Sequence, residues 1–304
     1  MSEIRVACAR VAQQSRHVSI EPAAIPAYAE ALQIGRKAPA CDAEADPASG
    51  TREQLAAFWL TLDAINFGSG WFSTLHKREG RSGYFTIAIG VRERFASRGP
   101  WGAEELAEID AAEIAETLLQ DRRHELMELF ARSLQDLGSH VTEQFGGRFA
   151  GIVDAAGESA ARLAALLGSW ESFSDTSGYE GLAVPFLKRA QIAAADLTRA
   201  GVAPFSDLHR LTMFADNLVP HVLRLDGVLR FDPQLVDRID RGELIEHGSP
   251  EEVEIRACAL HAVELLVASR PRSCAADVDY TLWARGQQPR YKASPRHRSR
   301  CTAY

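Results

Sequence analysis

The sequence contains few cysteines, and no two of them are close together. The five thiols are Cys8, Cys41, Cys258, Cys274 and Cys301, and none forms a CxxC pair. The odd number argues against a disulfide framework, and the absence of close pairs argues against a structural zinc site. We therefore expect free thiols and a reducing, cytoplasmic environment, with no metal bound.

Long apolar runs and nucleotide-binding motifs are also absent. No stretch of about 18 uncharged apolar residues occurs, so no membrane span is expected. The opening residues MSEIRVACARVAQQ do not show the apolar core of a secretory signal. The chain has no Gly-rich phosphate loop, HExxH motif, βαβ alternation or fixed-period repeat. These absences argue against P-loop enzymes, zinc proteases, parallel α/β folds and solenoids.

Positive charge is scarce over most of the chain. The formal net charge is −7, yet residues 285–304 carry six Lys or Arg and no acid, which leaves −13 for the remainder. A protein that binds nucleic acid over its whole surface is usually basic. The local cluster instead favours one anionic group on a small ligand, or a tail that packs on an acidic face.

Helix-forming residues dominate the composition. Alanine is the most frequent of the 304 residues, and it has the highest helix propensity. We therefore predict an all-α fold with room for one minor hairpin. A helical arm and a loop rich in Pro, Asp and Ser are predicted over residues 1–50, followed by one globular domain over residues 51–304.

Capping signals indicate where two of the helices begin. Thr51 and Gln54 match a capping box ahead of an apolar stripe. Ser249 and Glu252 do the same for a helix predicted over 250–268. Further helices are predicted over 184–201 and near 206–214, whereas residues 83–95 combine a strand-like start with a helical end.

A polar pair lies on the apolar helix LTLDAINFGSGWF. Asp63 and Asn66 are three residues apart and therefore share a helix face. A charged Asp in such a run costs free energy unless something pairs with it. Asp63 either accepts hydrogen bonds from an arginine or a backbone amide in the core, or forms a pocket wall with Asn66 beside the rings of Phe67 and Trp71.

A second acidic residue, Asp216, precedes a proline-containing helix in LTMFADNLVPHVLR. An Asp at this position is most often a helix N-cap. A carboxylate kept ionised by the helix dipole can also serve in catalysis. The residues alone leave both roles open.

Cations cluster at two places where helix stabilisation explains them poorly. Lys188 and Arg189 occupy the first turn of the helix in VPFLKRAQ, where positive charge opposes the helix dipole. Capture of a phosphate or carboxylate therefore competes with simple solvation as an explanation. The terminal PRYKASPRHRSRCTAY is typical of a disordered tail or a nucleic-acid patch. It follows DVDYTLWARGQ, whose acidic and aromatic residues are suited to reading the edge of a nucleobase.

Seven segments occur in the order in which a known family has them. These are INFGSGWF, SGYFTIA, VPFLKRAQIAAADL, LTMFADNLVPHVLR, GSPEEVEIRACALHAVELL, DYTLW and PRHRSRCTAY. The chain from residue 55 to 304 therefore resembles the queuosine salvage proteins, which are queuosine 5′-phosphate N-glycosylases. The resemblance implies a helical fold similar to the helical DNA glycosylases. It also implies hydrolysis of queuosine 5′-monophosphate to queuine and ribose 5-phosphate, without a metal or organic cofactor.

The resemblance also suggests roles for the residues singled out above. Asp216 is expected to stabilise the oxocarbenium-like transition state of N-glycoside cleavage. Because queuine has no N7 to protonate, contacts to the base gain importance. Candidates for the base are Asp63, Asn66, Phe67, Trp71, Asp279, Trp283 and Glu254, with Glu254 or Asp279 also available to the cationic amine and diol of the queuine side chain. Candidates for the 5′-phosphate are Lys188, Arg189, His297 and Arg298.

Two segments depart from the eukaryotic branch that the chain resembles. Residues 217–220 (NLVP) stand where an aromatic residue and an arginine are expected, and residues 68–70 (GSG) replace bulkier ones. Both bear on the choice among nucleoside, 5′-monophosphate and related 7-deazaguanine nucleotides. A glycosylase-like protein acting on nucleic acid, which the acidic body disfavours, and a non-catalytic 7-deazaguanine-binding protein remain alternatives. Composition does not decide the oligomeric state.

Overall fold

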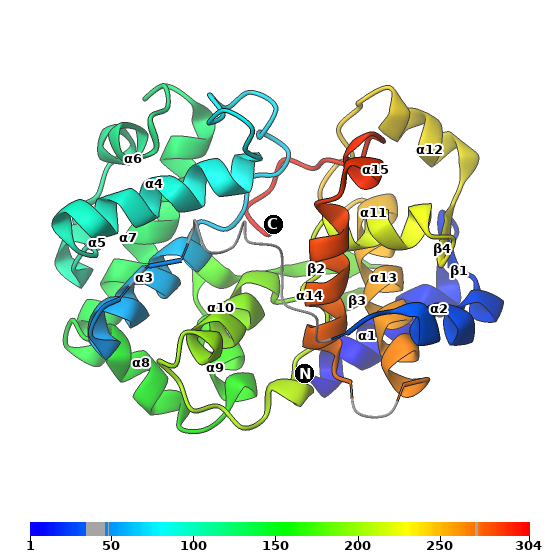
Figure 1. Ribbon diagram of the computed structural model, residues 1–304, viewed down its shortest axis with the longest axis horizontal. Helices are drawn as coiled ribbons and strands as arrows, with labels where there is room; N and C mark the ends of the chain where they lie inside the picture. Colours follow the sequence, from blue (N-terminus) through cyan, green and yellow to red (C-terminus); the bar gives the residue numbers. More distant parts are fainter. Residues whose placement is uncertain (35–45, 48, 271–272) are drawn as a thin grey trace.

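The helices form two lobes, each around its own hydrophobic core (Figure 1). We describe a computed structural model of the chain over residues 1–34, 46–47, 49–270 and 273–304. The core of the first lobe comes from residues 56–173 and 190–211, and that of the second from residues 4–32, 179–186 and 213–291. Most of the predicted loop rich in Pro, Asp and Ser lies outside the described residues.

The first lobe lies on the left of Figure 1 and runs from blue through cyan to green. It contains α3 (Arg52–Ala64), α4 (Gly83–Arg98), α5 (Ala103–Glu108), α6 (Ala111–Leu118), α7 (Glu125–Phe145), α8 (Phe149–Ala156), α9 (Ala160–Leu167) and α10 (Lys188–Arg199). Short 3-10 turns at Glu171–Phe173 and Leu208–Arg210 complete it.

The second lobe combines the beginning of the chain with its last third. It contains α1 (Ser2–Gln14), α2 (Ile25–Ala31), α11 (Leu218–Leu225), α12 (Pro233–Asp240), α13 (Pro250–Ala268), α14 (Ala275–Gly286), α15 (Pro289–Lys292) and a 3-10 turn at Pro22–Ala24. Strand β1 (Val18–Ile20) pairs antiparallel with β4 (Leu229–Phe231). The C-terminal segment returns to lie between the lobes (Figure 1).

The all-α prediction is confirmed, and the minor hairpin is present. It joins β2 (Thr176–Tyr179) to β3 (Leu182–Pro185) through Glu180 and Gly181, both at positive φ. Within the described residues, no helix has both the length and the apolar character needed to cross a bilayer.

Local capping sets several of the helix boundaries. The capping box of Thr51 and Gln54 forms at the start of α3, and the Ser249 side chain accepts from the Glu252 N–H at the start of α13. Helix α13 has the predicted bounds. The ambiguous residues 83–95 lie in α4, because the Ser82 hydroxyl caps the helix by accepting from the Phe85 N–H.

Two helix predictions needed correction. Helix α10 begins at Lys188 rather than at 184, because the preceding residues belong to β3 and Leu187 has a φ of 52°. The helix predicted near 206–214 is wrong, since a 3-10 turn at Leu208–Arg210 forms there instead. The Thr212 N–H donates to Gln191 Oε1 at 2.8 Å, so the backbone of this segment is satisfied by side chains of other helices.

The N-terminal arm is an integral part of the second lobe. Helix α1 packs against α13, and Ile4 and Val11 are buried in the shared core. Glu254 of α13 accepts hydrogen bonds from the backbone N–H groups of Arg16, His17 and Val18 at 3.0, 2.6 and 3.0 Å. This carboxylate therefore anchors the arm to the lobe.

A buried ion pair connects the two lobes. Arg256 of α13 donates to both carboxylate oxygens of Asp175, which precedes the hairpin, at 2.9 and 2.7 Å. The guanidinium also donates to the Ala215 carbonyl at 3.0 Å and lies over the rings of Phe186 and Tyr304. Burial alone would lower the pKa of Arg256, but Asp175 and nearby acidic groups outweigh it and raise that pKa. The pair thus holds α13, the hairpin and the C-terminal segment together.

Replacing this arginine should destabilise the fold strongly. Arg256→Met leaves Asp175 buried without its cation, so we expect a loss of about 3–5 kcal/mol in the free energy of unfolding. Urea unfolding followed by circular dichroism measures the loss. The control is Arg241→Met, which removes an exposed pair with Glu243 and should cost about 1 kcal/mol or less. Equal losses for the two variants would contradict the bridging role of Arg256.

Candidate functional site

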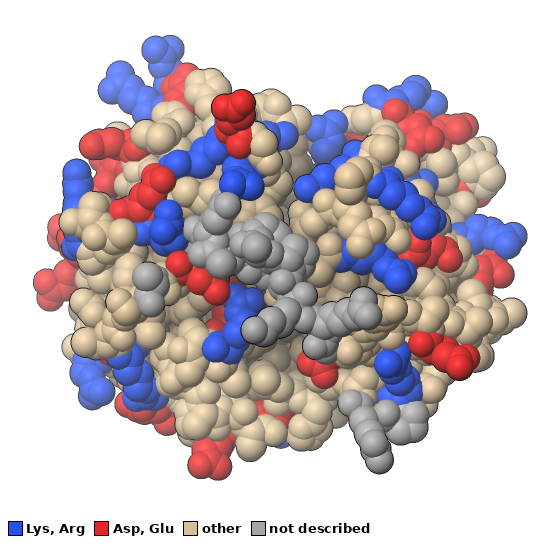
Figure 2. Space-filling model, viewed as in Figure 1, with Lys and Arg blue, Asp and Glu red and all other residues tan. Residues whose placement is uncertain are grey.

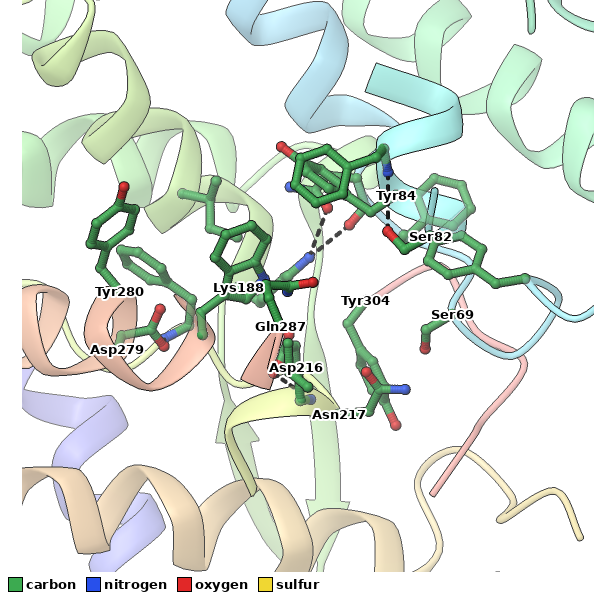
Figure 3. Close-up of a pocket in the computed structure, with 18 of the residues that line it drawn as sticks. Ser69, Ser82, Tyr84, Lys188, Asp216, Asn217, Asp279, Tyr280, Gln287 and Tyr304 are labelled. Atoms are coloured by element: carbon green, nitrogen blue, oxygen red, sulfur yellow. Dashed lines mark hydrogen bonds between the residues drawn. The ribbon is translucent and has the colours of Figure 1, made fainter. Parts of the chain in front are cut away.

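A cavity of about 370 Å³ lies between the two lobes. Its walls come from the turn after α3, the start of α4, one face of α10, the start of α11, helix α14 and the C-terminal segment. Figure 3 shows Lys188, Asp216 and Asp279 around the same space, with Tyr84 on another wall. Six of the predicted site residues line the cavity: Asn66, Phe67, Lys188, Asp216, Asp279 and Trp283.

Asp216 binds the backbone at the start of α11 and also lines the cavity. Its Oδ1 accepts hydrogen bonds from the backbone N–H groups of Leu218 and Val219, at 2.8 and 3.0 Å, at the start of α11. These donors and the helix N-terminus stabilise negative charge on the carboxylate. No described residue donates to Oδ2. The half-buried Asp216 is therefore held in place through Oδ1, which leaves Oδ2 available on the cavity side.

Lys188 places a buried amine beside this carboxylate. Its backbone N–H donates to Asp175 Oδ2 at 3.0 Å, so the lobe-bridging ion pair also fixes the start of α10. Its Nζ donates to the carbonyl and the side-chain Oδ1 of Asn66 at 2.7 and 3.2 Å (Figure 3). Burial lowers the pKa of Lys188 to about 8, although the nearby Asp216 charge opposes that shift.

Asp279 on α14 is a second carboxyl group in the cavity wall. It is 5% exposed, and its Oδ1 accepts from the Phe214 N–H at 2.9 Å. Burial and the nearby charge of Asp216 raise the pKa of Asp279 well above its usual range. Asp279 therefore keeps its proton to higher pH than an ordinary aspartate and can donate as well as accept. Two carboxyl groups in such different environments suit different chemical roles.

Aromatic side chains form one wall of the cavity. The rings of Tyr84 and Phe85 each lie 6.1 Å from that of Trp283, centre to centre. Phe67 also lines the cavity and packs edge-on against Phe130. Such surfaces can cover the faces of a planar base. Trp71 does not line the cavity, since its indole N–H donates to Glu125 at 2.8 Å.

The structure selects two cations from the basic C-terminal run. Lys292 and Arg296 line the cavity, and neither side chain has a hydrogen-bond or ion-pair partner among the described residues. Partial burial lowers the pKa of Arg296, against the opposing charge of Asp216. By contrast, Arg285 and Arg290 are paired with Asp226. The two cavity cations are therefore available to an anionic ligand.

The other predicted phosphate ligands lie elsewhere. Arg189 is buried behind the cavity, where it donates to the Ala64 carbonyl and lies over the ring of Phe67. Burial lowers the pKa of His297 to about 3, so its ring is neutral. Arg298 donates to the Ser73 hydroxyl and the Gly242 carbonyl at 2.8 and 2.7 Å.

Two predicted base ligands also lie outside the cavity lining. Both carboxylate oxygens of Glu254 already accept hydrogen bonds within the protein. Oε2 accepts from backbone N–H groups of the N-terminal arm, and Oε1 accepts from the Tyr179 hydroxyl. Asp63 is completely buried behind the cavity, and neither of its oxygens accepts a hydrogen bond of good geometry from a described residue. Burial and the neighbouring Asp196 raise the pKa of Asp63 well above its usual range.

The short residues at 68–70 make room for the C-terminal segment. The Gly68 N–H donates to the Tyr304 carbonyl at 3.0 Å. A Cβ at Gly70 would lie 2.3 Å from the Ser299 carbonyl oxygen, so a larger residue there would clash. Tyr304 is thereby held in the cavity wall, near Asn217 (Figure 3). This clash accounts for the glycine at 70, and a φ of 100° accounts for the glycine at 68.

Sequence reasoning did not single out several lining residues. These include Ser82, Tyr84, Ile192, Asp196, Asn217, Lys292, Ser294, Arg296 and Tyr304. A signal existed for Asn217, which follows Asp216, and for the two cations, which belong to the basic run. Nothing local distinguishes Tyr84 or Asp196 from other surface-prone residues, because only packing brings them to the cavity.

Comparison with known proteins agrees with these features. The family model described as "Queuosine salvage protein" matches residues 46–304. A protein of Sphaerobacter thermophilus is 37% identical, covering 97% of this chain and 95% of that protein. A Bos taurus protein is 30% identical, covering 97% of this chain and 96% of its own length. A Mus musculus protein is 34% identical over 59% of this chain and 58% of its own.

All three relatives carry the name queuosine 5′-phosphate N-glycosylase/hydrolase. The match extends over nearly the whole chain in the bacterial and bovine proteins, and it includes the segments that build both lobes and the cavity between them. The chain belongs to the queuosine salvage protein family.

Proposed function

We propose that this protein hydrolyses the N-glycosidic bond of queuosine 5′-phosphate to release queuine and ribose 5-phosphate. The names of its relatives describe that activity. The observation that carries the proposal is the position of Asp216, which lines the same cavity as Lys292 and Arg296, two cations without a hydrogen-bond or ion-pair partner among the described residues. A cytoplasmic location belongs to this proposal, because the four described cysteines are free thiols.

Asp216 would act at the sugar. When the C1′–N9 bond breaks, its electron pair goes to the base and positive charge develops on C1′ and the ring oxygen. A carboxylate held in place by backbone donors stabilises that charge without reorganising. Water then adds to C1′ and gives up a proton to a nearby base, while the departing base takes up a proton, so the products are ribose 5-phosphate and queuine. The backbone N–H groups at the start of α11 would therefore hold Asp216 in position for catalysis.

The leaving base must gain a proton at a position other than N7. A 7-deazaguanine carries carbon at position 7, so the usual site of purine protonation is missing. Burial and the charge of Asp216 raise the pKa of Asp279, so it holds its proton to higher pH than an ordinary aspartate, and it lines the same cavity as Asp216. It would supply the hydrogen bond or proton that neutralises the departing base. Trp283 would cover one face of the base, and Lys188 would keep Asn66 in place at its edge.

Lys292 and Arg296 would bind the 5′-phosphate. Both lie in the C-terminal segment at the cavity wall, and Arg296 is near enough to Asp216 for the two charges to interact. A phosphate attached to the sugar above Asp216 would therefore meet the guanidinium. This assignment favours the 5′-monophosphate over the nucleoside as the substrate.

Removing the charge of Asp216 should abolish turnover without unfolding the protein. For Asp216→Asn we expect kcat/KM to fall on the order of 10³-fold, because the amide cannot stabilise the developing cation. Mass spectrometry of queuine released from queuosine 5′-monophosphate measures the rate. Queuine binding should change only a few-fold. Asp154→Asn, which removes an exposed carboxylate paired with Arg52, serves as the control. An unchanged rate in Asp216→Asn would refute the assignment.

The phosphate role is tested by comparing two substrates. We expect Arg296→Gln to raise KM for queuosine 5′-monophosphate about 10- to 100-fold, as expected for losing about 1.5–3 kcal/mol of charge-assisted hydrogen bonding. The kinetics with the nucleoside queuosine should stay the same. Arg290→Gln is the matched control, because Arg290 lies in the same basic run but pairs with Asp226. Equal losses on both substrates would show that Arg296 acts on something other than phosphate.

A further inference from the structure

Asn217 stands at the N-cap position of α11, but its side chain does not cap the helix. Asparagine is among the residues most favoured at an N-cap, where its side chain accepts from a backbone N–H group. Here the Asp216 carboxylate accepts from the N–H groups of Leu218 and Val219, and the Asn217 side chain makes no capping hydrogen bond. The Asn217 amide is therefore left for another role.

The C-terminal segment fixes the orientation of this amide. Asn217 Nδ2 donates to the His297 carbonyl at 3.1 Å, and both residues are buried. The carbonyl of the next residue, Arg298, accepts from the Ile245 N–H at 2.9 Å, so the segment is itself attached to the second lobe. A flipped amide would bring Oδ1 against the His297 carbonyl oxygen, and two acceptors repel each other. Oδ1 is therefore the atom that points away from His297.

The Asn217 Oδ1 atom is an acceptor to which nothing donates. Asn217 is 4% exposed and lines the cavity. No N–H or O–H group of the described residues donates to Oδ1, yet this oxygen is not among the polar atoms that are sealed inside the protein without a partner. It therefore reaches the cavity. An acceptor in a nearly buried residue is costly to leave unpaired, so a ligand that supplies a donor there gains affinity.

This acceptor lies next to the carboxylate assigned to the sugar. Asn217 directly follows Asp216, so their Cα atoms are about 3.8 Å apart, and Figure 3 shows both at the same cavity. The inference rests on the proposed function, which puts C1′ of the sugar at Asp216. The hydroxyl group nearest to C1′ is on C2′. We propose that Asn217 Oδ1 accepts a hydrogen bond from the ribose 2′-hydroxyl and makes the site select ribonucleotides over 2′-deoxyribonucleotides.

The 2′-hydroxyl becomes a stronger donor as the reaction proceeds. Positive charge develops on C1′, the atom beside it, so a hydrogen bond from this hydroxyl to Oδ1 strengthens toward the transition state. Because the His297 carbonyl already orients the amide, the acceptor needs no rearrangement. Lys188 and Arg296 line the same cavity but carry only donors, so neither can accept this proton. The contribution of Asn217 should therefore appear mainly in kcat.

The first test removes the amide, the hydroxyl group, or both. The substrates are queuosine 5′-monophosphate and its 2′-deoxy analogue. Asn217→Ala should lower kcat/KM about tenfold on the ribonucleotide, mainly through kcat, and less than about threefold on the deoxy analogue. The control is Arg298→Gln, which loosens the same C-terminal segment outside the cavity and should change both rates by one factor. Equal losses for Asn217→Ala on the two nucleotides would show a purely structural role and overturn the proposal.

The second test does not depend on turnover. Calorimetry measures the binding of ribose 5-phosphate and of 2-deoxyribose 5-phosphate. The wild-type protein should bind ribose 5-phosphate at least about threefold more tightly, and Asn217→Ala should remove the difference. Equal wild-type affinities would overturn the inference even if Asn217→Ala failed to fold. A preference for the ribose compound without hydrolysis of queuosine 5′-monophosphate would support the role of Asn217 and refute the proposed function.

Discussion

The buried pair of Arg256 and Asp175 is the interaction on which the rest of the structure depends. Asp175 receives the backbone N–H of Lys188, so it fixes the first residue of α10. Arg256 holds the Ala215 carbonyl, one residue before Asp216. Lys188 and Asp216, whose charges interact in the cavity, are therefore both positioned by this one ion pair. Its desolvation cost is offset by hydrogen bonds to both oxygens and by two aromatic rings.

The two carboxyl groups of the cavity, Asp216 and Asp279, lie in different environments. Asp216 is half-buried and receives backbone donors at a helix start, which suits a carboxylate. Asp279 is almost fully buried near that charge and so holds its proton to higher pH. Asp216 lies at the start of α11 and Asp279 lies within α14, so each acid has its own surroundings although both belong to the second lobe. Proton donation and charge stabilisation can thus be divided between two residues of the same type.

Some predicted site residues are explained by their neighbours in sequence, and others only by distant parts of the chain. Asp216 combined a helix-cap position with a run of apolar neighbours, and both features survive in the structure. Glu254 is also an acidic residue on an apolar helix, α13. Its partners are backbone N–H groups of the N-terminal arm, 236 residues or more away in sequence. A buried acid signals that some partner exists. It does not reveal whether that partner is a ligand or a distant backbone segment.

The helix content, the helix starts after Thr51 and Ser249 and the family motifs could be predicted from the residues, because periodicity and capping act over a few neighbours. The sequence could not show which of the six cations in residues 285–304 line the cavity. Much of this segment is irregular, so no periodicity indicates the direction of the side chains of Lys292 and Arg296. The presence of Asp196 and Asp279 in the lining of one cavity likewise required both lobes to be packed together. Long-range packing decides which polar groups are left without partners, and those groups define the site.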